Sequence, residues 1–372
     1  MATMKIAEAM AQFADVLFRG KFSYYPDGMP FVSKAMSLRR RLNLLFCGID
    51  TVLRSPRLLS FPPVIQVEPT NTCNLKCPLC PTGLGIMKRK KGFMSMKTFQ
   101  AIIDEIGDTL ITVILYGWGE PFLNKDLPKM IRACKVRNIL TTTSTNGNSI
   151  TTLKNALDIV DSGLTGLIIA MDGSNQEIYK KYRKSGDFEK AIRSVSLIEE
   201  AKKRRGSEHP YTNIRLVVTK NNLHDIPEME KLAEKMGVNM FSYKSVCSLT
   251  YSNEFKYFEP TGDSKCRYEY KGTSRIPKGF FKCTFPFRQP TVFWDGTLVG
   301  CEFDYDSNAS WGKIGEINFK KIWNNSEATK LRNAIRRGRR DKLPPFCTRC
   351  PYQDRVQNSC VLYCKELRSQ SA

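Results

Sequence analysis

Histidine is almost absent from this chain of 372 residues, which contains only His209 and His224. Zinc hydrolases and Cys/His zinc fingers need imidazole ligands or bases, so the sequence disfavours both classes. No apolar run reaches the roughly 18 residues that a membrane span needs. The N-terminus also lacks a basic start followed by an apolar segment and a small-residue cleavage site, so we expect a cytoplasmic protein rather than a secreted one.

Cysteine, in contrast, is abundant, with 13 residues. The cytoplasm keeps thiols reduced, so clustered cysteines in a chain without an export signal bind metal more often than they form disulfides. Charge is also unbalanced, because 58 Lys and Arg residues stand against 36 Asp and Glu residues, a net charge of +22. We therefore expect an acidic partner: nucleic acid, an anionic membrane surface or a phosphorylated substrate.

Strand-like and helix-like segments alternate from residue 63 to residue 245. Short β-branched runs occur at 64–67, 110–115, 139–143, 167–170, 214–218 and 240–243, and helix-like segments lie near 95–107, 126–137, 151–161, 175–204 and 226–236. Thr70, Asp126 and Asp225 are expected to cap helices. This alternation predicts an α/β fold with parallel strands and right-handed crossovers, in a twisted sheet or partial barrel. Ligands of such folds bind at the C-terminal ends of the strands.

Two further regions flank this one. Residues 1–62 carry nine Lys and Arg against four Asp and Glu, with apolar residues at helical spacing, and predict a basic helical extension. Its helices either cover an open edge of the next domain or contact an anionic membrane peripherally through an amphipathic face. In residues 246–372 the stretch at 291–301 predicts a hairpin around Asp295-Gly296, and residues 322–338 predict a basic helix. We expect a small, cysteine-rich, metal-dependent domain here.

Three cysteines stand together directly after the first predicted strand, in the sequence Cys73-Asn-Leu-Lys-Cys77-Pro-Leu-Cys80. A structural zinc site needs four protein ligands that fill its coordination sphere, and no fourth cysteine or histidine is near in the sequence. Three thiolates on a cubane iron–sulfur cluster instead leave one iron open to a substrate. The spacing by itself favours iron–sulfur and leaves zinc as the alternative.

Polar residues follow the next three predicted strands as well. In Gly117-Trp-Gly119-Glu120-Pro121 the glycines allow a ligand close to the backbone, and Glu120 offers a carboxylate to an ammonium group. Ser144 and Asn146 end the third strand with side chains suited to ribose hydroxyls, and Asp172 ends the fourth. We expect all of these groups to face the mouth where the cysteine loop lies.

In these motifs the sequence resembles the radical S-adenosylmethionine (SAM) enzymes over roughly residues 60–365. The resemblance implies a partial (β/α)6 TIM-like barrel in which Cys73, Cys77 and Cys80 hold a [4Fe–4S] cluster, and the open iron of that cluster chelates the amino and carboxylate groups of SAM. It also implies a set of SAM-binding residues, with the ammonium held at the glycine-rich stretch and the ribose near the third strand: Gly117, Gly119, Glu120, Pro121, Ser144, Asn146 and Asp172. Arg183 is expected either to pair with the SAM carboxylate or to be a solvated helix charge.

A second group of cysteines lies in the C-terminal region, at Cys283, Cys301, Cys347 and Cys350. A hairpin and a CxxC turn can bring these four thiolates together around zinc or a second iron–sulfur cluster. The pattern, with Gly296 between the first two cysteines, resembles the SPASM/twitch extension of radical SAM enzymes. The resemblance implies one auxiliary [4Fe–4S] cluster on these four residues. The full pattern has a cysteine where Val356 stands in this chain, so we expect one auxiliary cluster rather than two. A second auxiliary cluster on Cys360, Cys364 and Cys266 is the alternative.

The resemblance further implies an oxidoreductase that cleaves SAM to a 5′-deoxyadenosyl radical, takes hydrogen from a substrate C–H position, and receives electrons from a flavodoxin or ferredoxin. Glu302 and Asp304, beside Cys301, are the candidate bases for such an oxidation. The substrate class stays open among a small sugar or polyol, a peptide and a lipid-linked metabolite. Residues 1–62 lack a clear winged-helix pattern, which disfavours a leader-guided peptide. Whether SAM is consumed or recycled, and the oligomeric state, also stay open.

A different class of protein accounts for part of the same sequence. The net charge and the basic stretch at 336–340 would suit a zinc-bearing nucleic-acid-binding protein. A radical SAM enzyme that modifies RNA would combine both interpretations. No added RNA-binding module is evident, so nucleic acid is the less favoured partner.

Overall fold

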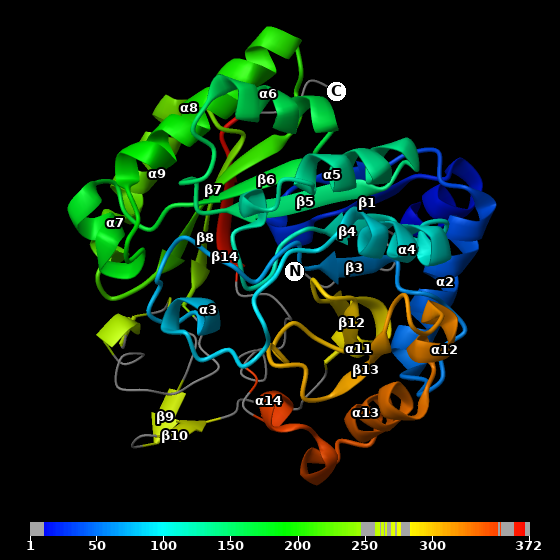
Figure 1. Ribbon diagram of the computed structural model, residues 1–372. Helices are drawn as coiled ribbons and strands as arrows, with labels where there is room; N and C mark the ends of the chain where they lie inside the picture. The colour runs from blue at the N-terminus through cyan, green and yellow to red at the C-terminus, as the bar shows by residue number, and fades with distance from the viewer. Residues whose placement is uncertain are drawn as a thin grey trace.

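The computed structural model describes residues 11–246, 257–260, 262–263, 265, 269–271, 274–276, 283–348, 350 and 361–368. One sheet of ten strands runs through the molecule in the order β13-β12-β11-β3-β4-β5-β6-β7-β8-β14. The sheet curves into an open partial barrel, with helices packed along its outer face (Figure 1). The α/β class and the partial barrel predicted from the sequence are therefore confirmed.

Six parallel strands form the centre of the sheet: β3 (Val64–Val67), β4 (Thr112–Ile114), β5 (Leu140–Thr145), β6 (Gly166–Ala170), β7 (Tyr211–Val218) and β8 (Met240–Ser245). Each strand pairs in parallel with the next one along the chain. Parallel strands are covered on both faces and so require continuous apolar, β-branched runs. All six predicted strands are present, and β7 is buried at every position.

The helices that cover the outer face follow the strands in order: α4 (Met96–Ile106), α5 (Leu127–Val136), α6 (Leu153–Ser162), α7 (Gln176–Tyr182), α8 (Phe188–Arg205) and α9 (Ile226–Met236). Ser95, Thr152 and Asp187 cap α4, α6 and α8 by accepting a hydrogen bond from the backbone N–H three residues on. The single helix predicted at 175–204 is two helices. The chain turns between them at Gly186, where a side chain would press against the ring of Tyr179.

Two of the three predicted capping residues, Asp126 and Asp225, occupy N-cap positions, but none of the three caps a helix through its side chain. Thr70 lies in a buried bridge opposite Phe93, and its hydroxyl donates to the Gly92 carbonyl at 2.6 Å. Asp126 and Asp225 stand at the starts of α5 and α9, but neither side chain accepts a capping hydrogen bond. The carboxylate of Asp225 instead accepts from the backbone and hydroxyl of Ser174. Short polar residues here fasten loops rather than helix ends.

The C-terminal region joins the sheet at both of its edges. The predicted hairpin is present as β11 (Thr291–Val292) and β12 (Thr297–Val299), followed by β13 (Ser310–Lys313), and β11 pairs in parallel with β3. At the other edge β14 (Val361–Glu366) pairs antiparallel with β8. The helix predicted at 322–338 is divided into α12 (Phe319–Trp323) and α13 (Ser326–Arg336). One apolar core includes Ile65 of β3, Trp323 of α12 and Leu331 of α13.

Shorter elements complete the described chain: α3 (Pro81–Leu84), α11 (Phe285–Arg288), α14 (Pro345–Thr348), η3 (Pro121–Leu123), η4 (Leu223–Asp225), η5 (Arg340–Lys342), β9 (Glu269–Lys271) and β10 (Ser274–Ile276). Within the residues that the structure covers, no helix combines the length and apolar character needed to cross a bilayer. The domain limits expected at 62/63 and 245/246 stay predictions.

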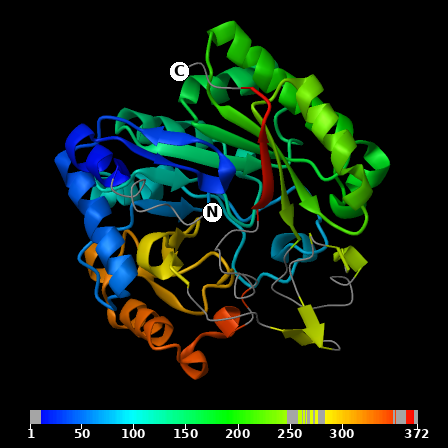
Figure 2. The ribbon, with the colours of Figure 1, turned by 180° about the vertical axis from the view of Figure 1, so that it is seen from behind.

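The N-terminal segment folds back onto the sheet. It forms η1 (Asp15–Arg19), a hairpin of β1 (Phe22–Tyr24) and β2 (Phe31–Ser33) around η2 (Pro26–Gly28), and the predicted long helix as α2 (Leu38–Leu53). Met29 and Phe31 pack against Ile168 of β6, Tyr211 of β7 and Met240 of β8. Figure 2 shows the hairpin across the face of the sheet turned away from the viewer in Figure 1. The sequence did not predict this hairpin.

Candidate functional site

A cavity of about 300 Å³ opens at the C-terminal ends of the central strands. Its walls come from the loop after β3, the ends of β4 to β8, the N-terminal hairpin and the loop after β12. The lining includes most of the residues predicted from the sequence: Cys73, Cys77, Cys80, Gly117, Gly119, Glu120, Ser144, Asn146, Arg183 and Glu302. Pro121, Asp172 and Asp304 do not line it.

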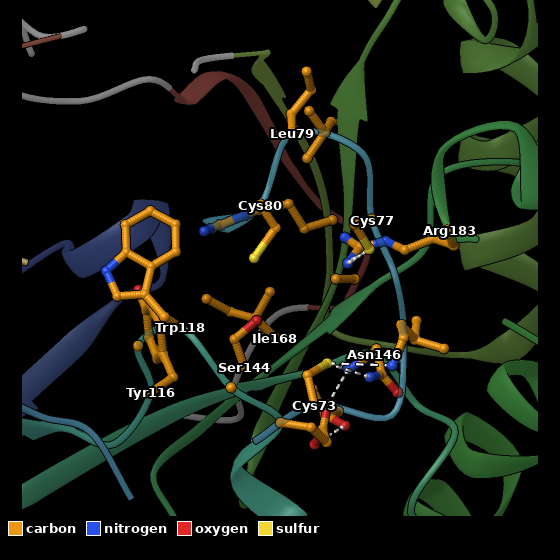
Figure 3. Close-up of a pocket in the computed structure, with 18 of the residues that line it drawn as sticks. Cys73, Cys77, Leu79, Cys80, Tyr116, Trp118, Ser144, Asn146, Ile168 and Arg183 are labelled. Atoms are coloured by element: carbon orange, nitrogen blue, oxygen red, sulfur yellow. Dashed lines mark hydrogen bonds between the residues drawn. The ribbon is translucent and has the colours of Figure 1, made fainter. Parts of the chain in front are cut away.

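The three cysteines of the first motif share one wall of the cavity, and Figure 3 shows their sulfur atoms around a common space. Pro81 opens α3 immediately after Cys80, so the loop turns into a helix at once. Gly83 of α3 packs on the backbone of Cys77, and any side chain there would overlap the Cys77 carbonyl. The tight loop therefore depends on a glycine as well as on the cysteines.

Burial keeps the Cys73 and Cys77 thiols protonated when nothing is bound. It raises the pKa of Cys73 to about 12 and that of Cys77 to about 11, and charge on the neighbouring cysteines adds to both shifts. Thiolates form here only when a metal centre replaces the protons. In the described part of the chain no three His, Cys, Asp or Glu side chains are placed to hold a single metal ion. Three soft thiol ligands in one cavity suit an iron–sulfur cluster or zinc.

Glu120 is a buried carboxylate at the edge of this cavity. It accepts hydrogen bonds from the Thr145 hydroxyl at 2.9 Å and from the backbone N–H of Asn146 at 2.8 Å. These partners are neutral, and burial raises the pKa of Glu120 to about 7. Gly119 holds the stretch against the cysteine loop, since a side chain there would overlap the Thr70 carbonyl. The arrangement offers a cationic ligand a desolvated carboxylate.

Asn146 and Arg183 touch the cysteine loop directly. The Asn146 side chain donates to Asn74 Oδ1 at 2.8 Å and approaches Cys73 Sγ at 3.9 Å. Arg183 donates to Cys77 Sγ at 3.8 Å and forms an ion pair with Asp172. It is therefore a largely buried cation rather than a solvated helix charge. Asp172 lies behind Arg183 and accepts from the Val217 backbone N–H at 2.6 Å.

The wall opposite the cysteines consists of residues that the sequence did not single out. Arg215 of β7 forms an ion pair with Asp27 at 2.9 Å, and the Tyr116 hydroxyl donates to the same carboxylate at 2.7 Å. Burial opposes ionisation of Asp27, but Arg215, Tyr116 and Lys244 together hold its pKa below the usual value. Lys244 of β8 lines the same wall. Arg215 and Lys244 could have been found from the sequence, because each is a charged residue within a predicted strand. Nothing in the sequence indicated that Asp27 lies here.

The second group of cysteines also comes together. Charge on Cys283 and Cys350 raises the pKa of both Cys301 and Cys347, in addition to the larger effect of burial. The pKa of the Cys283 thiol is raised to about 12, mainly because the thiol is buried and in addition because of charge on Cys350. These thiols are near enough to influence one another electrostatically, and thiolates are soft metal ligands.

The alternative ligands for a further cluster have a different position. Cys364 lies on β14 next to Gly28, and the charged groups that act on it are Arg215 and Asp27. Cys266 and Cys360 lie outside the described residues. A second auxiliary cluster on these cysteines stays a prediction.

The two candidate bases are in different surroundings. Glu302 lines the cavity, and its carboxylate accepts a hydrogen bond from Gln66 Nε2 at 2.7 Å. Asp304 is buried away from the cavity and accepts from the backbone N–H groups of Asn308 and Ala309 at 2.9 and 2.8 Å. The geometry gives Asp304 the role of holding its own loop.

Two family models match the chain. The radical SAM superfamily model matches residues 67–233. The SPASM model, an iron–sulfur cluster-binding domain, matches residues 283–351. Each match includes one of the two cysteine groups described above.

Related proteins match most of the chain at low identity. Mycofactocin maturase MftC of Mycobacterium tuberculosis is 23% identical over 330 residues, which are 82% of this chain and 80% of that protein. The tungsten-containing aldehyde ferredoxin oxidoreductase cofactor-modifying protein of Pyrococcus furiosus is 24% identical, covering 78% of this chain and 87% of its own. The crystal structure of Streptococcus suis SuiB, also solved with its precursor peptide SuiA, has a TM-score of 0.56 at 15% identity, covering 79% of this chain and 72% of SuiB.

Proposed function

Because the chain is a member of the radical SAM superfamily with a C-terminal SPASM domain, we propose that it oxidises or remodels a C–H position of a polar substrate by radical chemistry. Radical SAM domains bind a [4Fe–4S] cluster and SAM, and SPASM domains bind auxiliary iron–sulfur clusters. The observation that carries the proposal is the meeting of three thiols and the Glu120 carboxylate in one cavity at the strand ends. The zinc-bearing nucleic-acid-binding alternative has no comparable support.

The cysteine loop and the residues facing it have separate tasks in this proposal. Cys73, Cys77 and Cys80 hold the cluster, and Arg183 stabilises the thiolate of Cys77. Glu120 binds the SAM ammonium, while Ser144 and Asn146 contact the nucleoside. The chemistry supplied by the bound cluster and SAM is reductive cleavage of a carbon–sulfur bond, which yields a 5′-deoxyadenosyl radical able to take hydrogen from an unactivated carbon.

The opposite wall binds the substrate. Asp27, Arg215, Lys244 and Tyr116 present groups of both charge signs and a hydroxyl within one cavity. Mixed charge selects a substrate with hydrogen-bonding groups rather than a purely apolar one. We favour a peptide segment, since SuiB is solved with a precursor peptide and MftC is named a maturase.

Glu302 acts as the base that removes a proton from the substrate radical. Its hydrogen bond from Gln66 orients the carboxylate toward the cavity. Cys283, Cys301, Cys347 and Cys350 would hold the auxiliary cluster, which would supply an acceptor for the remaining electron. Loss of a hydrogen atom from the substrate, transfer of a proton to Glu302 and removal of this electron would together make the two-electron oxidation of a C–H position. An oxidoreductase of this kind works in the cytoplasm with a flavodoxin or ferredoxin as electron donor.

The test is anaerobic reconstitution followed by measurement of iron, sulfide and 5′-deoxyadenosine. The wild-type protein, reduced and supplied with SAM, is expected to release 5′-deoxyadenosine and to hold about eight irons per chain. Cys77→Ala should lower the iron content by about four and reduce the release of 5′-deoxyadenosine to background.

Cys134→Ala is the matched control, because Cys134 is a buried core thiol of α5. It should keep both the iron content and SAM cleavage. The proposal fails if Cys77→Ala still cleaves SAM, or if the purified protein is colourless and holds zinc.

A further inference from the structure

The side of helix α2 that faces the protein carries polar residues as well as Leu44, Leu45 and Cys47. Arg40, Asn43 and Asp50 are buried. The Arg40 guanidinium donates to the carbonyls of Gly107 at 3.0 Å and Arg137 at 2.7 Å, and Asn43 exchanges two hydrogen bonds with the Phe61 backbone. These polar residues stabilise the helix on the protein, so its other side is not needed for folding.

The opposite side of α2 is apolar and exposed. Its large side chains recur every three to four residues and therefore form one continuous stripe along the helix: Leu38, Leu42, Phe46, Ile49, Val52 and Leu53. Val52 is 81% exposed and Ile49 is 49% exposed. Arg41 fastens the neighbouring helical turn η1 by donating to the Leu17 carbonyl at 3.0 Å. Phe13 and Phe18 on that segment are further exposed apolar side chains, 52% and 77% exposed.

Exposed cations lie at both ends of the stripe. Lys34 and Arg39 precede or begin α2, and Arg57 follows it. Acidic residues are scarce on this side: within the described residues 11–62 they are Asp15, which pairs with Arg19, Asp27 in the cavity wall, and the buried Asp50. Asp108, which follows α4, pairs with Arg39, and Asp104 of α4 pairs with Arg137.

We propose that this surface, the apolar stripe of α2 with Phe13 and Phe18, docks the enzyme on an anionic lipid bilayer. A helix that lies in the plane of a membrane needs an apolar side to enter the interface and cations to meet the headgroups. The surface has both, and its positive charge is complementary to anionic lipid. A soluble partner protein with an apolar groove would not require cations at both ends of the helix.

Docking in this way leaves the cavity free. Arg40 of α2 contacts the loops that lead into β4 and β5, at the N-terminal ends of the strands, whereas the cavity lies at their C-terminal ends. The proposal goes beyond the proposed function and does not depend on it.

The experiment is flotation of the reconstituted, cluster-containing protein with vesicles of phosphatidylcholine alone or mixed with phosphatidylglycerol. We expect binding to the mixed vesicles and little binding to the neutral ones. Ile49→Gln should weaken partitioning about fivefold, because roughly half of an isoleucine side chain no longer enters the interface. The triple variant Leu42→Gln, Phe46→Gln, Ile49→Gln should lose about a hundredfold, and Lys34→Glu with Arg57→Glu about tenfold or more.

Ile317→Gln is the matched control, since Ile317 is of the same type, is 47% exposed and lies outside this surface. All variants change exposed residues, so iron content, melting temperature and 5′-deoxyadenosine release should be unchanged. The proposal is overturned if the wild type does not float with anionic vesicles, or if the triple variant floats as well as the wild type. It is also overturned if the wild type is a dimer that the triple variant splits while vesicles bind neither, because the stripe would then join two copies of the chain.

Discussion

The proposed function gives Glu120 the task of binding the amino group of SAM. Burial raises the pKa of this carboxyl to about 7, so near neutral pH about half of the ligand-free protein has it uncharged. A carboxyl with a raised pKa loses its charge as the pH falls through that value. SAM binding should therefore weaken below pH 7 by up to about tenfold per pH unit.

Isothermal titration of the cluster-containing protein between about pH 5.5 and 7 would measure this dependence. An α-amino group titrates at about 7.7–8.0 and must lose its proton to chelate the open iron, so this titration contributes equally to the wild type and to Glu120→Gln. Glu120→Gln should bind SAM more weakly and keep the iron content of the wild type. The steeper pH dependence of the wild type then measures the contribution of Glu120, and equal pH dependences in the two proteins would contradict it.

At this scale the sequence predicted the residues that lie in compact motifs. Cys73, Cys77, Cys80 and Glu120 could be found because each is fixed by a short spacing after a strand. Asp27 could not be found from the sequence, because it lines the cavity only as a result of the packing of the N-terminal hairpin on the sheet. Asp304 was a candidate base because it is close to Cys301 in the sequence. In the structure its carboxylate accepts hydrogen bonds from the backbone of its own loop.

Among the elements, α2 shows most clearly what periodicity can and cannot predict. The sequence predicts a helical extension over residues 1–62, and α2 lies within it, but the bounds of this helix were not predicted. The usual inference that the apolar side is buried fails here, because Arg40 and Asn43 find backbone partners that satisfy them inside the protein. The break between α7 and α8 was missed for a similar reason, since it follows from the contact of Gly186 with Tyr179.

Arg40→Ala tests the polar attachment of α2. It leaves the carbonyls of Gly107, Arg137 and Asn138 without their donor, and we expect a loss of about 2–4 kcal/mol in the free energy of unfolding. Arg39→Ala is the control from the next residue, because Arg39 is exposed and pairs only with the exposed Asp108. It should cost no more than about 0.5–1 kcal/mol. Urea denaturation of both variants would contradict this account if the two losses were equal.

For the molecule as a whole, the SPASM region is part of the same sheet rather than a separate body. β11 pairs with β3, the strand that leads to the cysteine loop. Arg89 forms a buried ion pair with Glu68 at 2.8 Å and donates to the Tyr305 carbonyl, and Trp118 donates to the Glu302 carbonyl at 2.8 Å. These contacts hold the two cysteine groups in a fixed relation. The sequence indicated both groups but not the shared sheet, because strand pairing between distant segments leaves no local pattern.

Cys347→Ala should separate the roles of the two cysteine groups. We expect about four irons to be lost while part of the 5′-deoxyadenosine release remains, because the first cysteine loop is unchanged. Substrate oxidation should stop. Since β11 to β13 and α13 share the core of the barrel, the melting temperature should also fall. Iron analysis, SAM cleavage and thermal melting of the same preparation measure all three, and full substrate turnover in this variant would exclude an electron-accepting role for the second site.

The strand β14 pairs with β8, and the N-terminal hairpin rests on β6, β7 and β8. The hairpin is synthesised before the strands that it rests on, so its docking surface exists only after about two hundred further residues have followed. The edge of β8 stays uncovered until β14 has been made. A chain that lacks β14 therefore exposes an unpaired strand edge, and truncation shortly before β14 should yield a protein prone to aggregate even though both of the cysteine groups that the proposed function uses are present.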